Sequence, residues 1–360
     1  MLKKAAALLL VCASIVAWVG CGTTTSKFLY AAIPASNEIV IFREDPNSGA
    51  LTQLVGSPIT AGQAVQSLVL HPNKKYLYAA NSGATPAGTV SLFNISSTGA
   101  LTEQTPRYNV GTAPTLLAVD PSGSYLYVGN SGSFDISVFS IDSSTGNLTP
   151  IAQSGGGATA PIGMSPLNMQ LSPSGKTLFV TGQALASQGT IEAFPISNGV
   201  LDTPVVSATG NLPYGLAMDS GGAHLYTANK YDNSISAFTV NSDNTLTLIS
   251  TTGEISTGPI ALFIDKSGKY LYVANSQSSG NLAAFSIGSD GDLTLLASSP
   301  FQTASQPNLV TGDSSGKYLF VGNQSTPVLQ SFSLDSSSGT LTSVSSYSVP
   351  GTPTSIVLTQ

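Results

Sequence analysis

Short apolar segments alternate with polar turns along the chain, and one pattern returns seven times from Lys27 onward. Each copy holds an apolar strand, a Gly-containing turn, a Tyr-Leu-Tyr-Val-Ala-Asn-like strand, an alternating strand that ends near Phe, and Gly-x-Leu-Thr. The Leu of the second strand returns about every 48 residues, which is the length of a propeller blade. It stands at Leu29, Leu77, Leu126, Leu178, Leu225, Leu271 and Leu319. The marker Phe keeps the same interval, at Phe42, Phe93, Phe139, Phe194, Phe238, Phe285 and Phe332.

Turn chemistry separates four strand-sized segments within each copy. In Asp120-Pro121-Ser122-Gly123, the Asp side chain can accept backbone hydrogen bonds, Pro presets φ and Gly accepts a left-handed conformation. Four-stranded sheets of this kind bury their faces on neighbouring blades when they are arranged radially. The sequence therefore predicts an all-β chain folded as a seven-bladed β-propeller with four-stranded antiparallel blades.

The two ends of the repeat region complement each other. The first copy begins at Lys27 directly with the second strand of the repeat, so its first, inner strand is missing. The chain ends at 353–358 with a segment that resembles an inner strand and has no second strand after it. We expect the C-terminal strand to complete the first blade, because this pairing removes two free sheet edges.

The N-terminus has the features of an export signal. Lys3 and Lys4 precede the apolar stretch Ala5 to Val19, which ends at Gly20-Cys21. This ending is similar to the bacterial lipobox, in which the Cys is lipidated, although Trp18 stands where Leu is usual. We predict a lipoprotein-type signal peptide over 1–21 with lipidation at Cys21, a tether over 22–26, and the propeller over 27–360. Ordinary secretion is the alternative.

Composition restricts the partners. Charged residues make up only 8% of the chain and acidic residues outnumber basic ones, 18 to 12. Nucleic acid is therefore excluded as a partner, because phosphate binding requires clustered Lys and Arg. The other Cys, Cys12, lies within the signal peptide, so the propeller has no disulfide and no Cys-ligated zinc. We expect a monomer outside the cytoplasm, held at the periplasmic or cell-surface membrane, without metal or cofactor.

The repeats Lys75 to Asn81 and Lys269 to Asn275, each followed by Gly-x-Leu-Thr, resemble the lactonase-type seven-bladed propellers. That family includes 6-phosphogluconolactonase-like enzymes and YVTN-repeat surface proteins of bacteria, and the resemblance covers residues 27–360. It implies a catalytic Arg, His and Glu at the channel mouth. This chain carries Leu167, Asn168 and Gln183 at those positions. Neutral side chains cannot replace the acid and base, so the resemblance implies loss of the family's catalytic set.

The channel mouth can be predicted from the starts of the inner strands and the ends of the second strands. The candidate ligand-binding residues are Gln66, Asn168, Gln183, Tyr214, Lys230, Asn308 and Gln324, with Ser276 beside them. Lys230, Tyr231 and Asp232 form the only expected ionisable cluster and are the candidate catalytic residues. The ring is polar, aromatic and nearly uncharged, which suits a glycan, a small lactone or a peptide backbone. A solvated channel without ligand is the alternative.

Other patterns favour structural interpretations. His71 and His224 fall in turns on the face opposite the mouth. The Gly-rich run at 155–160 has no following helix and is expected to be a loop. Asp290-Gly291-Asp292 fits a hairpin tip, and the recurring Asn81, Asn130, Asn229, Asn275 and Asn323 fit Asx-type turn caps.

Three functions remain open from the sequence. The first is an exported binding module that has kept the lactonase scaffold and lost its catalytic residues. The second is a lactone hydrolase acting on a non-phosphorylated sugar lactone. The third is a structural or adhesive surface protein that uses its Ser/Thr-rich outer strands.

Overall fold

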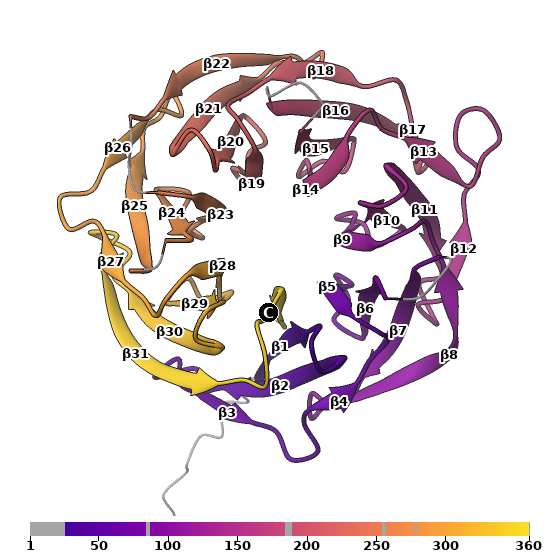
Figure 1. The fold of residues 1–360 in the computed structure, drawn as a ribbon, viewed down its shortest axis with the longest axis horizontal. Coiled ribbons are helices and arrows are strands. Elements are labelled where there is room, and N and C mark those ends of the chain that lie inside the picture. The colour runs from indigo at the N-terminus through magenta and orange to yellow at the C-terminus, as the bar shows by residue number, and fades with distance from the viewer. Residues whose placement is uncertain (1–25, 84–86, 184–188, 254–256, 278, 360) are drawn as a thin grey trace, which may run out of the picture.

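The computed structural model describes residues 26–83, 87–183, 189–253, 257–277 and 279–359. These residues form only β-strands and the turns between them, arranged as seven antiparallel sheets around a central channel (Figure 1). No helix in this part of the chain could span a membrane. The predicted seven-bladed propeller is confirmed.

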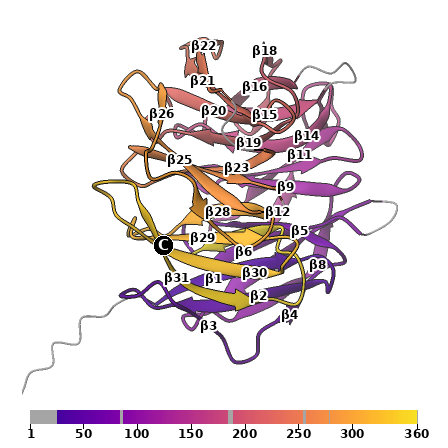
Figure 2. The ribbon, with the colours of Figure 1, turned by 60° about the vertical axis from the view of Figure 1, so that its left-hand side comes forward.

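Each blade runs from an inner strand at the channel to an outer strand at the rim (Figure 1), and Figure 2 shows the same blades in a turned view. The inner strands are β5 (Val65–Leu70), β9 (Pro114–Val119), β14 (Ser165–Leu171), β19 (Pro213–Met218), β23 (Pro259–Ile264), β28 (Pro307–Gly312) and β32 (Ser355–Leu358). The second strands are β1 (Lys27–Ile33), β6 (Tyr76–Asn81), β10 (Tyr125–Asn130), β15 (Thr177–Gln183), β20 (His224–Asn229), β24 (Tyr270–Asn275) and β29 (Tyr318–Asn323). The third strands are β2 (Glu38–Glu44), β7 (Thr89–Ile95), β11 (Asp135–Ile141), β16 (Gly189–Ser197), β21 (Ser234–Val240), β25 (Asn281–Ile287) and β30 (Val328–Leu334).

The outer strand is continuous in three blades and interrupted in four. It is continuous as β8 (Leu101–Asn109), β22 (Leu246–Thr251) and β31 (Leu341–Ser348). It is interrupted as β3 (Leu51–Gln53) with β4 (Ile59–Thr60), β12 (Leu148–Pro150) with β13 (Thr159–Pro161), β17 (Val200–Leu201) with β18 (Val205–Ala208), and β26 (Leu293–Leu295) with β27 (Phe301–Gln302). Both members of each pair bond to the same third strand, so the four-stranded plan is kept.

The Leu and Phe markers form the repeating unit of the core. In every blade the marker Leu lies directly opposite the marker Phe, as in Leu77 with Phe93 and Leu271 with Phe285. All fourteen side chains are at most 3% exposed. Directly opposed apolar side chains stabilise a strand pair, which explains why these two markers recur at the same interval.

Tyrosine hydroxyls connect neighbouring blades. A second-strand Tyr donates to the carbonyl of a left-handed Gly in the next blade, in the pairs Tyr30–Gly99, Tyr78–Gly146, Tyr226–Gly291 and Tyr272–Gly339, at 2.8–3.0 Å. The Tyr127 hydroxyl is buried and has no partner among the described residues. The hairpin that it faces, in blade four, is shortened to a two-residue turn between Ser197 and Val200. Burial raises the pKa of these phenols, which keeps them protonated as donors.

The C-terminal strand closes the ring, as the sequence predicted. β32 is the inner strand of blade one and pairs with β1 in the register Leu29 with Leu358. The Thr359 hydroxyl accepts a hydrogen bond from the Phe28 amide at 2.8 Å, and Thr354 donates to the Gln66 carbonyl of blade two at 2.8 Å. The predicted signal peptide, Cys21 and residues 22–25 of the tether lie outside the described residues.

Candidate functional site

A β-bulge at the start of the inner strands directs one side chain per blade into the channel. The register with the second strand shifts by one residue in blades two to seven. The six unpaired residues are Gln66, Thr115, Leu167, Tyr214, Ile260 and Asn308, and all six line the central cavity. A bulge re-aims a side chain in this way because its residue is free of the ladder. Thr354 lines the cavity at the equivalent place in blade one.

A left-handed residue positions most of these bulges. Ala64, Ala113, Leu212, Gly258 and Gln306 all have φ between 50° and 71°, and each precedes the first residue of its inner strand. The carbonyl of each accepts the amide of the residue after the second strand, as in Ala113 with Ser131, Leu212 with Lys230 and Gln306 with Gln324. Four of these left-handed residues carry a Cβ, so their conformation costs energy that the surrounding structure must offset.

The cavity has a volume of about 540 Å³ and two chemically different sides. Asn308, Thr354, Gln66 and Thr115 form a polar arc over blades seven, one, two and three. On the opposite arc, over blades four to six, the bulge residues are Leu167, Tyr214 and Ile260, with Asn168 and Lys230 beside them. The resemblance already placed Leu167 at the mouth, but the sequence analysis missed Thr115, Ile260 and Thr354 as cavity residues. Their shared signal is the position directly after a Pro, which is visible in the sequence.

Hydrogen bonds within the mouth hold several of these polar side chains in place. The Asn308 Nδ2 donates to the Pro353 carbonyl at 2.7 Å, and the Thr352 hydroxyl donates to the Gln324 carbonyl at 3.1 Å. Across the channel, the Asn168 Nδ2 donates to the Tyr214 carbonyl at 3.1 Å. These polar groups are therefore positioned before any ligand arrives.

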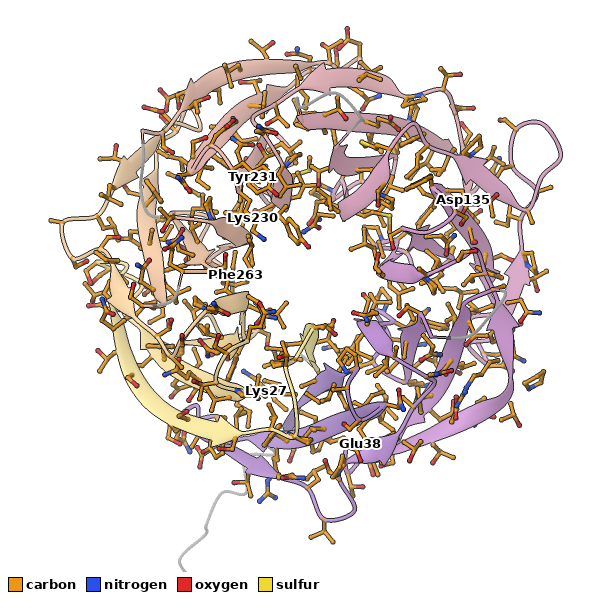
Figure 3. The ribbon with its side chains drawn as sticks, in the orientation of Figure 1. Lys27, Glu38, Asp135, Lys230, Tyr231 and Phe263 are labelled. Atoms are coloured by element: carbon orange, nitrogen blue, oxygen red, sulfur yellow. The ribbon has the colours of Figure 1, made fainter. Side chains whose placement is uncertain are left out.

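Lys230 is the only fully charged side chain that lines the cavity among the described residues. Its ammonium group lies over the Tyr214 ring, 4.8 Å from the centroid, and Figure 3 shows Lys230 beside the central channel. A cation in this position is attracted by the negative face of the ring. Blade five therefore contributes an aromatic surface with one cation to a cavity that is otherwise neutral.

The predicted mouth residues fall into two groups. Gln66, Asn168, Tyr214, Lys230, Asn308 and Gln324 all line the cavity, and their role in ligand binding stays a prediction. Gln183 ends β15, and its side chain lies outside the described part of the structure.

The expected ionisable cluster does not form. Tyr231 is 66% exposed and does not line the cavity. Asp232 does not line the cavity either, and its side chain accepts a hydrogen bond from the Asn211 amide at 2.6 Å. Ser276, which was also expected at the mouth, lies outside the cavity lining and donates to the Gly258 carbonyl at 2.9 Å. Successive residues of a tight turn point in different directions, so Lys230 alone of the three candidate catalytic residues faces the channel.

The two histidines have structural contacts on the face opposite the mouth, as expected. The His71 Nε2 bonds to the Gly123 carbonyl at 2.9 Å, while its Nδ1 accepts the Asn73 amide at 3.1 Å. The His224 Nδ1 pairs with Asp219 at 2.9 Å. Both rings stabilise hairpins that join an inner strand to a second strand.

The interpretation of the recurring Asn residues as turn caps was wrong. Asn81, Asn130, Asn229, Asn275 and Asn323 are at most 1% exposed. All five donate through Nδ2 to a side chain on the third strand of the same blade, as in Asn229 with Ser234 and Ser236, or Asn323 with Gln330. They are interior crosslinks and do not face the channel.

The two remaining motifs have no site geometry. Residues 155–158 of the Gly-rich run lie in the loop between β12 and β13, and Thr159 and Ala160 begin β13, so the run was only partly a loop as expected. Asp290 accepts the Asp292 amide at 3.2 Å within a hairpin. Among the described residues, no group of three or more His, Cys, Asp or Glu side chains could hold a metal ion.

Comparisons with known proteins agree with this architecture. The family model described as "Lactonase, 7-bladed beta-propeller" matches residues 59–162, 207–304 and 262–358. A search of curated protein sequences found no significant match.

Solved structures extend the likeness to the whole ring. A crystal structure of a putative 6-phosphogluconolactonase from Bacteroides fragilis has a TM-score of 0.81 and 21% identity, and covers 94% of this chain and 99% of its own. A Lactobacillus plantarum protein has a TM-score of 0.80 and 20% identity, with coverage of 93% and 99%. A periplasmic gluconolactonase from Pseudomonas aeruginosa has a TM-score of 0.78 and 18% identity, with coverage of 93% and 99%. At these identities the likeness shows the fold.

Proposed function

This chain belongs to the lactonase family of seven-bladed β-propellers, and on that premise we propose that it is an exported module that binds a neutral, hydroxyl-rich ligand at its channel mouth. The observation that carries the proposal is the two-sided ring of the cavity. Polar side chains on one arc can hydrogen-bond hydroxyl groups, while Tyr214 and its apolar neighbours offer a flat surface to the face of a sugar ring.

The distribution of charge supports a neutral ligand. Apart from Lys230 at the mouth and Arg107 on the outer strand β8, every Lys and Arg from residue 27 onward lies at the opposite, base end of the strands or in the hairpins there. A phosphorylated ligand would meet one cation at the mouth, whereas phosphate sites normally combine several donors. A neutral sugar or sugar lactone fits the site better.

Binding can be tested on residues 27–360 with methyl glucoside and glucono-1,5-lactone by titration calorimetry. Tyr214→Ala should weaken binding about 10-fold, because aromatic contacts contribute roughly 0.5–1.5 kcal/mol. Gln324→Leu should weaken it by a similar factor through loss of a polar group. Gln302→Leu, an exposed position on β27, is the matched control. Equal affinity in all four proteins would place the ligand elsewhere.

We expect little or no hydrolysis of 6-phosphogluconolactone. Water attack needs a base and a group that stabilises the oxyanion, and the family's Arg, His and Glu correspond by resemblance to Leu167, Asn168 and Gln183. Absence of a positioned acid or base removes roughly 10²–10⁴-fold in rate. Robust turnover that is abolished in Lys230→Met and retained in Asp232→Asn would establish catalysis at the mouth and contradict the expectation.

A lactone hydrolase acting on a non-phosphorylated sugar lactone is the second candidate. The structural likeness to a protein titled periplasmic gluconolactonase favours it. Measurement of glucono-1,5-lactone hydrolysis above the spontaneous rate separates this candidate from simple binding. A structural or adhesive role would instead leave mouth variants without effect.

Export and lipid anchoring at Cys21 complete the proposal, supported by the apolar stretch before Gly20-Cys21. The anchor would hold the base of the propeller near the membrane, because β1 starts at that end. Cys21→Ser should move the protein from the membrane fraction to the soluble fraction. If the unaltered protein is already soluble after export, simple secretion is the correct alternative.

A further inference from the structure

The exposed aromatic side chains gather on one face of the propeller. Phe134, Tyr214 and Tyr231 are 50%, 37% and 66% exposed, and no other described Phe or Tyr reaches this exposure. Tyr214 starts an inner strand, and the other two lie in turns between second and third strands, so all three belong to the mouth face. The exposed aliphatic side chains lie on the outer strands instead, as does Leu248, or in the turn between β3 and β4, as does Val55.

Phe134 occupies a backbone position that does not favour it. Its φ is 56°, in the left-handed region, where a bulky residue is a clear outlier. The equivalent turn positions in blades one and five are Asn37 and Asn233, with φ of 58° and 52°. Their Oδ1 atoms accept the amides of Ala64 at 2.6 Å and Gly258 at 2.9 Å. Phe134 cannot make this bond, and half of its side chain remains exposed, so packing offers little compensation for the strain.

Tyr231 extends the aromatic surface of blade five outward from the channel. It follows Lys230, whose ammonium group covers Tyr214 inside the cavity. Figure 3 shows Tyr231 and Asp135, the residue after Phe134, on opposite sides of blade four. The exposed rings of Phe134 and Tyr231 therefore flank the blade that carries Leu167 and Asn168 at the mouth.

We propose that this aromatic rim, defined as Phe134 and Tyr231, binds the outer units of a neutral oligosaccharide whose first unit occupies the mouth. The inference rests on the proposed function of the mouth and adds that the ligand is longer than one sugar. Single, separated rings each match the apolar face of one sugar unit, and the neighbouring Asp135 and Asp232 can accept hydrogen bonds from sugar hydroxyl groups. A protein partner would need a continuous core of about 800 Å² on this side, whereas the centre of the face is the open cavity.

The test uses immobilised residues 27–360 and neutral β-1,4-glucan, α-1,4-glucan and β-1,4-mannan oligomers of one to six units. Affinity should rise at least about 10-fold from one unit to six. Phe134→Asn and Tyr231→Ser should each remove about three- to tenfold of the affinity for the hexamer and leave binding of the single unit unchanged. Leu248→Ser, which is 56% exposed on β22, is the matched control.

The outcomes separate the two proposals. Binding that depends on Tyr214 but is independent of oligomer length would overturn the aromatic rim and leave the mouth proposal intact. Absence of binding at every length would overturn both.

Phe134→Asn also has a readout that needs no ligand. Asn tolerates the left-handed conformation and can bond the neighbouring turn, so the melting temperature should rise by about 1–2 °C. A lower melting temperature would assign Phe134 a packing role and overturn its part in the rim.

Discussion

Removal of residues 350–360 is expected to unfold the whole propeller rather than fray one end. The deletion takes away β32, which pairs with β1 over four residues and lies next to blade two. Ile356 and Leu358 are each 9% exposed and belong to the core between blades one and seven. Without them, Leu29 and its neighbours on β1 would face water along an open edge.

The expected loss approaches the total stability of a typical domain. Burial of each aliphatic side chain contributes roughly 1.5–3 kcal/mol, and the exposed partners on β1 add a similar amount. Native proteins are stable by only about 5–15 kcal/mol. The truncated chain should therefore lose its cooperative thermal transition. A peptide of residues 350–360 supplied in trans should restore the transition, whereas a scrambled peptide should not. An unchanged melting temperature after truncation would show that β32 does not close the ring.

The sequence was sufficient to predict the fold because the blade repeat has strong local signals. Leu and Phe markers at equal intervals identify the strands that bury side chains, and the unpaired ends of the chain identify the closing partner. Side-chain directions in short turns carry no such signal. Lys230 and Tyr231 are neighbours in the sequence, yet only Lys230 faces the cavity.

Two further features depend on strand register. The position after a Pro marks Thr115 and Ile260 in the sequence, but the one-residue shift between inner and second strands that aims them at the channel is seen only in the structure. The interior role of Asn229 and its equivalents depends on which face of the second strand packs inward. A one-residue change of register reverses every side chain of a strand.

A buried carboxyl group at the interface between blades one and seven is expected to make the stability of the fold depend strongly on pH. Glu44 is 1% exposed, and neither carboxyl oxygen has a hydrogen-bond partner among the described residues. It lies opposite Lys27 on β1, whose ammonium group pairs with Asp313 at 2.6 Å. Asp45 and Tyr318 are the other titratable groups near Glu44. Arg43, Glu44 and Asp45 together line a small cavity. Burial raises the pKa of Glu44 to about 7, and Lys27 only partly opposes this shift.

This raised pKa makes the fold less stable as the pH rises. The ordinary pKa of 4.5 applies to the unfolded chain, so between about pH 4.5 and 7 the folded state binds more protons. The contribution of Glu44 to the free energy of unfolding is most favourable at low pH, falls between about pH 4.5 and 7, and stays constant at higher pH. The difference between a pKa of 4.5 and one of about 7 corresponds to roughly 3 kcal/mol.

Glu44→Gln should remove this pH dependence, because an amide of the same shape does not ionise. The free energy of unfolding of the variant relative to the unaltered protein should increase by about 2–3 kcal/mol between pH 5 and pH 8, as measured by denaturant titration. The comparison cancels the other titrating groups, which are shared by both proteins. Glu38→Gln, at the opposite end of β2, is the matched control for the loss of one carboxyl group from this strand. Parallel pH profiles for Glu44→Gln and the unaltered protein would show that Glu44 is already ionised in the fold and that Lys27 compensates fully for its burial.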